Sequence, residues 1–280
     1  ETVFLAYTPN DVSVITSTMA RLQNSQKESK ARTELALQTN VVHTLDLGLP
    51  TQHVQDLVHN GVVRLNGVLS SDLCDRVLAD VNENLDRAIS NDDCMTIETG
   101  YGNVLSRAHR WDIYQRNEGV IAESLIDMFG DRNCELSRLF YDLFDKRDAF
   151  FHELAALVSD PGAASQAIHP DTPFDVCAPL YIVFVALQDV TEAMGCTIFL
   201  PGTNTQTCHD QYKSRVVAED FSVADAYRRA VLKKGDCAIM DSRLLHCGAA
   251  NSASRRALLY FTLRNPLFTG AEPPAGSKFE

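Results

Sequence analysis

The sequence predicts an α+β protein in which a helical N-terminal scaffold packs on a C-terminal double-stranded β-helix, or jelly roll. In the N-terminal half, apolar residues recur at the three- and four-residue spacing of amphipathic helices. From about residue 150, short runs of strand-forming residues alternate with Pro, Gly, Asn and Asp, which is typical of a sandwich or jelly roll. We therefore expect one domain, with a mainly helical scaffold over 1–149, the jelly-roll core over 150–265 and an irregular tail over 266–280.

The expected helices begin with residues 70–90, where Ser70 or Ser71 can cap the first turn. Further helices are expected near 119–130 and over 134–148. The segment 103–116 between the first two helices is expected to be strand or loop. The apolar stripes that predict the first and third helices are Leu73, Val77, Val81 and Leu85, and Leu136, Leu139, Phe140 and Leu143.

The expected strands follow in the C-terminal half, separated by turn-forming residues. They cover residues 153–160, 178–190, 196–202, 236–241 and 257–264. One stretch, 218–232, has helical spacing and is expected to interrupt them as a helix.

The composition excludes several classes of partner. The formal net charge is −12, which argues against nucleic acid and anionic membrane surfaces. No apolar run approaches the roughly 20 residues of a membrane span. The eight cysteines form no C-x-x-C pair, so we expect small buried thiols in a soluble protein of a reducing compartment. The chain begins at Glu1, so a start Met and a targeting segment are missing, and the compartment and the oligomeric state stay open.

The chemistry of the chain is concentrated in His169-Pro170-Asp171 and a distant histidine, His246. Residues i and i+2 of a strand face the same side, so His169 and Asp171 can reach one ion. His246 comes at the end of the strand-like run 235–246, where a site is usually built. Two imidazoles and one carboxylate are the ligands of mononuclear non-haem Fe(II) oxygenases, which leave coordination positions open. The sequence therefore predicts an Fe(II) site that uses O2.

Two arginines open the next expected strand. Neighbouring strand residues face opposite sides, so one of Arg255 and Arg256 is expected to point into the barrel and the other away from it. A guanidinium binds a carboxylate through two parallel hydrogen bonds, and a buried arginine gains from an incoming carboxylate. Either arginine is thus a candidate clamp for a dicarboxylate cosubstrate.

Taken together, these segments resemble the phytanoyl-CoA dioxygenase family of Fe(II)/2-oxoglutarate oxygenases, over about residues 150–265. The matching stretches, in order, are Gln166–Asp171, Met194–Thr203, and Gly235 through His246, Gly248, Asn251 and Arg255–Leu258. The resemblance implies that His169, Asp171 and His246 bind Fe(II), and that Arg255, Thr197 and Gln166 contact 2-oxoglutarate. Arg255 fits the family's arginine position better than Arg256. The chain departs from the family's usual Pro-Gly-Ser-His at Pro201-Gly202-Thr203-Asn204, which leaves substrate contacts there uncertain.

The expected activity is oxidation of an unactivated C–H bond of a small-molecule metabolite, with release of succinate and CO2. Hydroxylation is the default, and oxidative ring closure of the kainoid type is another outcome among relatives. Asp171 argues against halogenation, because related iron halogenases carry Gly or Ala there. The cation-rich segment around Arg107, His109 and Arg110 is a candidate contact for an acidic substrate, and a salt-bridged surface is the alternative. The alternative for the whole chain is a cupin-like binding protein without catalysis.

Overall fold

The computed structural model describes residues 50–90, 101–103, 108–131, 134–214 and 227–271. The helical elements are α3 (Pro50–Asn60), α4 (Ser71–Ser90), α5 (Gly119–Phe129), α6 (Glu135–Leu143), the 3-10 turn η5 (Glu192–Met194) and α7 (Gln206–Ser214). The strands are β1 (Val62–Leu65), β2 (Tyr101–Asn103), β3 (Arg110–Tyr114), β4 (Phe150–Ser159), β5 (Leu180–Ala186), β6 (Thr197–Phe199), β7 (Arg228–Arg229), β8 (Cys237–Asp241), β9 (His246–Gly248) and β10 (Arg256–Arg264).

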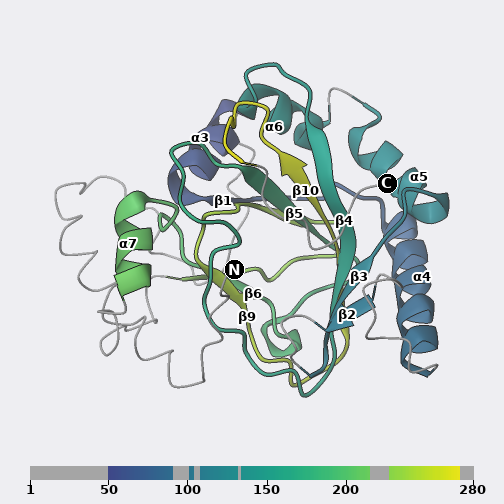
Figure 1. Cartoon of the computed structure of the whole chain (residues 1–280). Coiled ribbons are helices and arrows are strands. Elements are labelled where there is room, and N and C mark those ends of the chain that lie inside the picture. The colour runs from purple at the N-terminus through teal and green to yellow at the C-terminus, as the bar shows by residue number, and fades with distance from the viewer. Residues whose placement is uncertain (1–49, 91–100, 104–107, 132–133, 215–226, 272–280) are drawn as a thin grey trace.

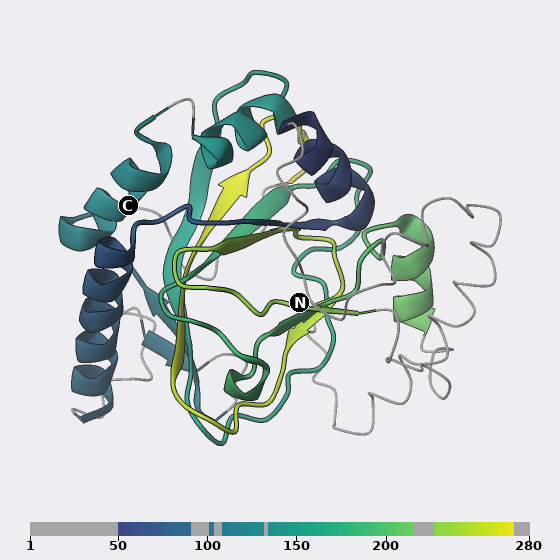
Figure 2. The same ribbon diagram turned by 180° about the vertical axis from the view of Figure 1, so that it is seen from behind.

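Two antiparallel sheets form the core. The larger has seven strands in the order β1-β8-β5-β10-β4-β3-β2, and the smaller has three in the order β7-β6-β9. Neighbours such as β1 and β8 or β5 and β10 are distant in sequence, as in a jelly roll, whereas β2, β3 and β4 follow one another along the chain. Helices α4 and α5 lie on one side of the molecule and α7 on the opposite side, while α3 and α6 lie together at one end (Figures 1 and 2). The predicted jelly-roll class is confirmed.

The large sheet separates two apolar clusters, and β10 shows how its sequence serves both. Alternate residues of a strand point to opposite faces. On β10, Ala257, Leu259 and Phe261 join the cluster on the outer face, whereas Leu258 and Tyr260 join the cluster on the inner face. A strand buried on both faces therefore reads as a continuous apolar run, and β10 is buried along almost its whole length.

The outer face is covered by helices. α4 buries the stripe that its sequence predicts, and this stripe packs with α5, α6 and the outer side chains of the sheet. Each fully buried Val or Leu contributes about 1.5–3 kcal/mol, so this layer dominates the stability of the fold. The buried residues of α4 are Leu73, Cys74, Val77, Val81, Leu85 and Ala88.

The inner face is covered only in part. The small sheet and its flanks place Phe199 and Cys196 over the inner side chains of β5, β8 and β10. Further along, on β3 and β4, the inner positions Asp112, Tyr114 and Glu153 stay half-buried. The fold thus leaves part of the inner wall accessible, which is where a substrate can approach.

Several elements differ from the sequence-based expectations. β1, β2 and β3 belong to the large sheet, so a boundary at residue 149 between scaffold and core cuts across that sheet. The helix expected over 218–232 is wrong in its described part, where β7 pairs with β6 and Leu232 forms a bridge with Val190. Its first residues, to 226, lie outside the described residues. Helices α3 and α7 and strand β9 were not predicted.

Two findings bear on the expected environment. Within the described part, none of the helices has the length and apolar character of a membrane span. The described cysteines are free thiols, and five of the seven are buried; Cys94 lies outside the described residues. Burial raises the pKa of the Cys74 and Cys196 thiols to about 11, so these cysteines act as small apolar side chains.

Candidate active site

His169, Asp171 and His246 come together at the edge of the small sheet. One ligand atom of each lies within 4.8 Å of the others. The backbones of His169 and His246 form an isolated antiparallel bridge, with both N–H···O distances at 3.0 Å. The amide of Asp171 donates to the carbonyl of Ser242 at 2.9 Å. The predicted triad is therefore assembled from two segments that pair side by side.

The expected reason for this grouping was partly wrong. His169 and Asp171 do not share a regular strand, because residues 171–172 form a bend after the bridge at His169. Asp171 reaches the histidines because its backbone is held by Ser242 instead. The pairing partner that brings the two segments together is thus a tertiary feature, which the spacing of His-x-Asp alone does not reveal.

Both imidazoles present the same nitrogen to the centre. Nδ1 of His169 donates to the carbonyl of Ala167 at 2.8 Å, and Nδ1 of His246 donates to that of Leu244 at 3.0 Å, which sets the tautomer. Each Nε2 then carries a lone pair and lies 3.7 Å from Oδ1 of Asp171. Two imidazole lone pairs and a carboxylate oxygen around one point fit a divalent ion such as Fe(II).

The burial of the triad is graded. The side chain of His246 is 7% exposed, that of His169 26% and that of Asp171 36%. The centre is therefore closed on the side of His246 and accessible on the side of Asp171. Such an arrangement holds an ion while leaving one side open to small molecules.

The two neighbouring arginines have opposite surroundings. Arg255 donates to Asp160 at 2.6 Å and to Asp86 on α4 at 2.7 Å, and these carboxylates raise the pKa of its guanidinium. Arg256 is 4% exposed, and no carboxylate among the described residues pairs with it. The expectation that one arginine faces the interior is confirmed, but the choice of Arg255 as the clamp is not supported, because its charge is already neutralised.

Arg256 carries an uncompensated charge. It donates to the carbonyl of Gly195, while its Nε has no hydrogen-bond partner among the described residues. Burial, with a smaller contribution from the nearby charge of Arg110, lowers its pKa to about 10. A buried cation without a counter-ion is costly, so this side chain favours an incoming carboxylate.

Arg256 belongs to a polar row across three strands. Ser159 of β4 is in register with Arg256 of β10 on one side and with Arg110 of β3 on the other, so the three side chains share the inner face. Arg110 is 3% exposed, and Ser159 is fully buried with a hydroxyl that has no partner among the described residues. Two cations and an unused hydroxyl are suited to bind an anion.

Gln166 and Thr197 lie beside this row, next to Gly248. The amide of Gly248 donates to Oε1 of Gln166 at 2.7 Å, and the amide of Gln166 donates to the carbonyl of Gly248 at 2.8 Å. Thr197 pairs with Gly248 across β6 and β9. A Cβ at Gly248 would lie 2.6 Å from Oε1 of Gln166 and 2.7 Å from Nη1 of Arg110, so a larger residue here would displace these two side chains. Both residues are thus near the polar row.

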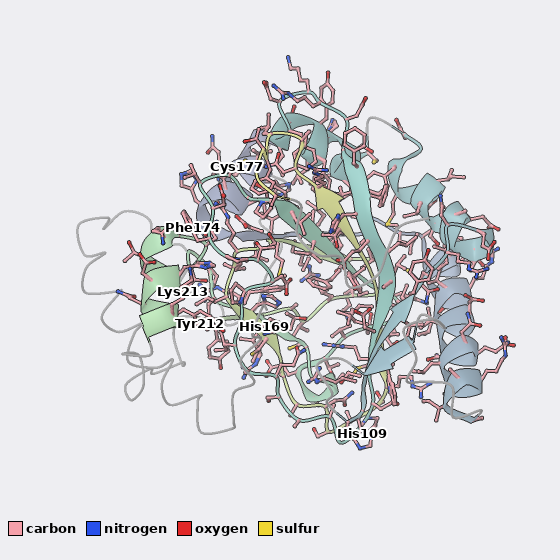
Figure 3. All side chains as sticks on the ribbon, in the orientation of Figure 1. His109, His169, Phe174, Cys177, Tyr212 and Lys213 are labelled. Atoms are coloured by element: carbon pink, nitrogen blue, oxygen red, sulfur yellow. The ribbon has the colours of Figure 1, made fainter. Side chains whose placement is uncertain are left out.

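The three residues expected on the substrate side separate. Arg107 lies outside the described residues. His109 is exposed on a turn, with a positive φ of 65°, and lies at the periphery, well away from His169 (Figure 3). Arg110 is buried and donates to the carbonyls of Ala164 and Ala249. Of the two described residues, His109 is therefore on the surface and Arg110 reaches the interior.

Sequence reasoning missed an acidic stretch of the inner wall. Tyr260 donates its hydroxyl to both carboxylate oxygens of Asp112 at 3.1 Å, and Thr262 donates to Glu153 at 2.7 Å. Burial, opposed by the Tyr260 hydrogen bond and aided by the charges of Glu153 and Asp171, raises the pKa of Asp112 to about 7. The alternation Arg110-x-Asp112-x-Tyr114 was a period-two signal for a polar inner face.

Residues 57–257 match the family of phytanoyl-CoA dioxygenase (PhyH). The chain belongs to the phytanoyl-CoA dioxygenase family. Membership makes it a non-haem iron, 2-oxoglutarate-dependent enzyme, and the triad and the buried Arg256 agree with that class. Among curated proteins, none matches the chain.

Three solved structures illustrate the similarity of the fold. AviO1 from Streptomyces viridochromogenes Tue57 is 18% identical with a TM-score of 0.60, over 83% of this chain and 99% of AviO1. The α-ketoglutarate-dependent epimerase SnoN from nogalamycin biosynthesis, in complex with Fe3+, α-ketoglutarate and nogalamycin RO, is 18% identical with a TM-score of 0.54, over 82% and 95%. The carbocyclase SnoK is 15% identical with a TM-score of 0.53, over 79% and 85%. At such low identities, the TM-scores show that these proteins share the fold of this chain.

Proposed function

We propose that the protein is an Fe(II)- and 2-oxoglutarate-dependent dioxygenase that oxidises a C–H bond of a small-molecule substrate. The observation that supports it best is the pairing of an open His-Asp-His cluster with Arg256, a buried arginine that no carboxylate of the described residues neutralises. A metal-binding protein without catalysis needs the first feature but has no use for the second. A dicarboxylate cosubstrate explains both.

Each residue has a proposed role toward the metal and cosubstrate. His169, Asp171 and His246 would hold Fe(II), with the two Nδ1 hydrogen bonds keeping both rings in the binding orientation. Arg256 would neutralise the distal carboxylate of 2-oxoglutarate, and this contact replaces the proposal for Arg255. When bound, iron would allow O2 to act as the oxidant, with one pair of electrons coming from the decarboxylation of 2-oxoglutarate to succinate and CO2 and the other from the C–H bond of the substrate.

The neighbouring polar row supports the same cosubstrate. Arg110 and Ser159 share the inner face with Arg256, so their donors add to the site for the distal carboxylate. Gln166 and Thr197 border this row through Gly248, and we propose that they also contact 2-oxoglutarate. Because these residues are buried or nearly so, bulk water is excluded and each charge-assisted hydrogen bond is stronger than at the surface.

The outcome of the oxidation depends on the substrate more than on the triad. SnoN is an epimerase and SnoK a carbocyclase, so one fold supports different reactions. We propose hydroxylation as the default and oxidative ring closure as the second candidate. Asp171 supplies the carboxylate ligand, which favours either of these over halogenation.

The inner wall near Asp171 favours a substrate whose group next to this wall is not acidic. Asp112 and Glu153 face the interior there, and the charge of Asp171 acts on Asp112. A carboxylate of a substrate next to these groups would be repelled, whereas a hydroxyl or an amine would be accepted. This replaces the expectation that the segment around Arg107, His109 and Arg110 recruits an acidic substrate at the mouth.

An anaerobic titration tests the proposal. Addition of 2-oxoglutarate to the Fe(II)-loaded protein should produce the weak visible charge-transfer band of the chelate. Asp171→Ala should lose the band together with succinate formation, because one of three ligands is gone. Iron binding without the band in the unaltered protein would instead support the cupin-like binding protein.

A further inference from the structure

A single five-residue segment contacts both parts of the metal triad. This connection, residues 241–245, links the end of β8 to His246, the first residue of β9. The carbonyl of Ser242 accepts the amides of Asp171 at 2.9 Å and Thr172 at 3.0 Å, and the carbonyl of Leu244 accepts Nδ1 of His246. The position of the 241–245 connection therefore determines how the carboxylate ligand lies relative to the distal histidine.

Arg243 fastens this connection to the segment that follows Asp171. Its Nη1 donates to the carbonyls of Asp175 at 2.6 Å and Val176 at 3.2 Å. Its Nε donates to Oδ1 of Asp241 at 2.9 Å, and its own backbone amide donates to the same oxygen at 2.9 Å. One guanidinium thus joins residues 171–177 to the turn that leads into His246.

The surroundings hold the guanidinium in one orientation. Asp241 is fully buried and also accepts Nδ2 of Asn204 at 3.1 Å, and Arg243 is 8% exposed. The ring of Phe174 lies 5.5 Å from the guanidinium, and the carbonyl of Arg243 accepts Nε2 of His209 on α7 at 2.7 Å. Phe174 and α7 lie on the same side of the molecule as His169 (Figure 3).

A buried ion pair of this kind is better explained by geometry than by stability. Removing both charges from water costs about as much as their attraction returns, so such pairs add little net stability. A planar guanidinium, however, directs its donors at fixed angles and can bind a carboxylate and two carbonyls at once, which an ammonium cannot do.

We propose that Arg243, oriented by Asp241, is a positioning residue that sets Asp171 against His246 and thereby preorganises the metal triad. It touches neither metal nor substrate in this role and acts through the backbone of residues 171–177. The inference rests on the proposed metal site and goes beyond it, because it assigns the cause of the triad's geometry to a residue outside the triad.

The opposite end of β8 offers a matched control. There Asp236, which precedes β8, pairs with Arg64 of β1, and Arg64 also donates to the carbonyl of Val231. The side chains are 11% and 7% exposed, close to the 10% and 1% of the Arg243–Asp241 pair. Both pairs join a buried carboxylate, an arginine and a backbone carbonyl, but only the Arg243 pair contacts the triad segments.

The test measures Co(II) binding to the metal-free protein by calorimetry and by the visible absorption of the bound ion. Arg243→Lys should weaken Co(II) binding by about 10–100-fold, the usual effect of losing an orienting partner. Arg64→Lys should change it by less than about threefold, although urea unfolding should show a similar loss of stability in both. Asp241→Asn should act in the same direction as Arg243→Lys and serves if that variant folds poorly.

A double-mutant cycle separates positioning from general damage. If Arg243 acts through Asp171, Arg243→Lys should have almost no further effect on Co(II) binding in the Asp171→Ala background. An equal loss in both backgrounds, or unchanged binding in Arg243→Lys, would overturn the inference while leaving the proposed function intact. Failure of the unaltered protein to bind Co(II) would overturn both.

Discussion

Arginines on the outer and inner faces of the seven-stranded sheet have different surroundings. Arg255 and Arg256 are neighbours in sequence, yet Arg255 pairs with Asp86 of the outer helix α4 and with Asp160. Arg256 is buried on the inner face, where none of the carboxylates that the structure describes pairs with it. Carboxylates raise the pKa of the first guanidinium, and burial lowers that of the second. On the outer face the arginine is neutralised by carboxylates. On the inner face the charge of Arg256 is left for a ligand, as we propose.

The largest expected effect concerns packing on the outer face. Phe261 is fully buried there, 5.5 Å from the ring of Phe129 and 5.4 Å from that of Phe151. Phe261→Ala should lower the free energy of unfolding by about 3–5 kcal/mol, measured in urea. The folded fraction should keep its affinity for Co(II). A loss of metal affinity in folded protein would show that the two faces are not independent.

The next effect concerns the cosubstrate arginine of the inner face. Arg256→Gln removes the cation while keeping a polar side chain, so the KM for 2-oxoglutarate should rise about 100-fold, which corresponds to about 3 kcal/mol. The KM can be measured from the rate of succinate release at increasing concentrations of 2-oxoglutarate, with no other substrate added. The free energy of unfolding should stay the same or increase, because the substitution removes a buried charge. An unchanged KM would exclude Arg256 as the clamp.

A smaller effect concerns the acidic inner wall. Because burial raises the pKa of Asp112 to about 7, its carboxyl stays protonated in the folded protein at pH values where the unfolded chain has ionised. The metal-free protein should therefore lose about 2 kcal/mol of stability as the pH rises from about 5 to 7. Asp112→Asn should remove this part of the slope in urea titrations at several pH values. The same slope in both proteins would contradict the raised pKa.

The smallest effect is expected for Arg255. Its side chain is 27% exposed and its two ion pairs are partly screened by solvent, so Arg255→Met should cost at most about 1 kcal/mol. The KM for 2-oxoglutarate should stay within about twofold of the unaltered protein. A large rise in this KM in Arg255→Met, together with an unchanged KM in Arg256→Gln, would reverse the proposed roles of the two arginines.

Local patterns predicted the parts of the fold that depend on local physics. The four-residue stripe of α4 and the apolar runs of β5, β8 and β10 were visible in the sequence, because each must bury a continuous face or both faces. The elements α7 and β9 were not predicted. In β9, the three residues His246–Gly248 are too few to show a periodic pattern, and they form a strand only because β6 lies beside them.

The sequence by itself determined the chemistry of this protein: the two histidines, the aspartate, a pair of arginines and the glycine-rich turns that identify the family. Only the tertiary structure decided which arginine has carboxylate partners, because that depends on Asp86 and Asp160, which are distant in sequence from Arg255. It also decided why the triad assembles at all. His169 meets His246 through a bridge between segments, and the 241–245 connection holds Asp171 beside them. Residue types fix what a site can bind, whereas long-range pairing fixes where each charge points.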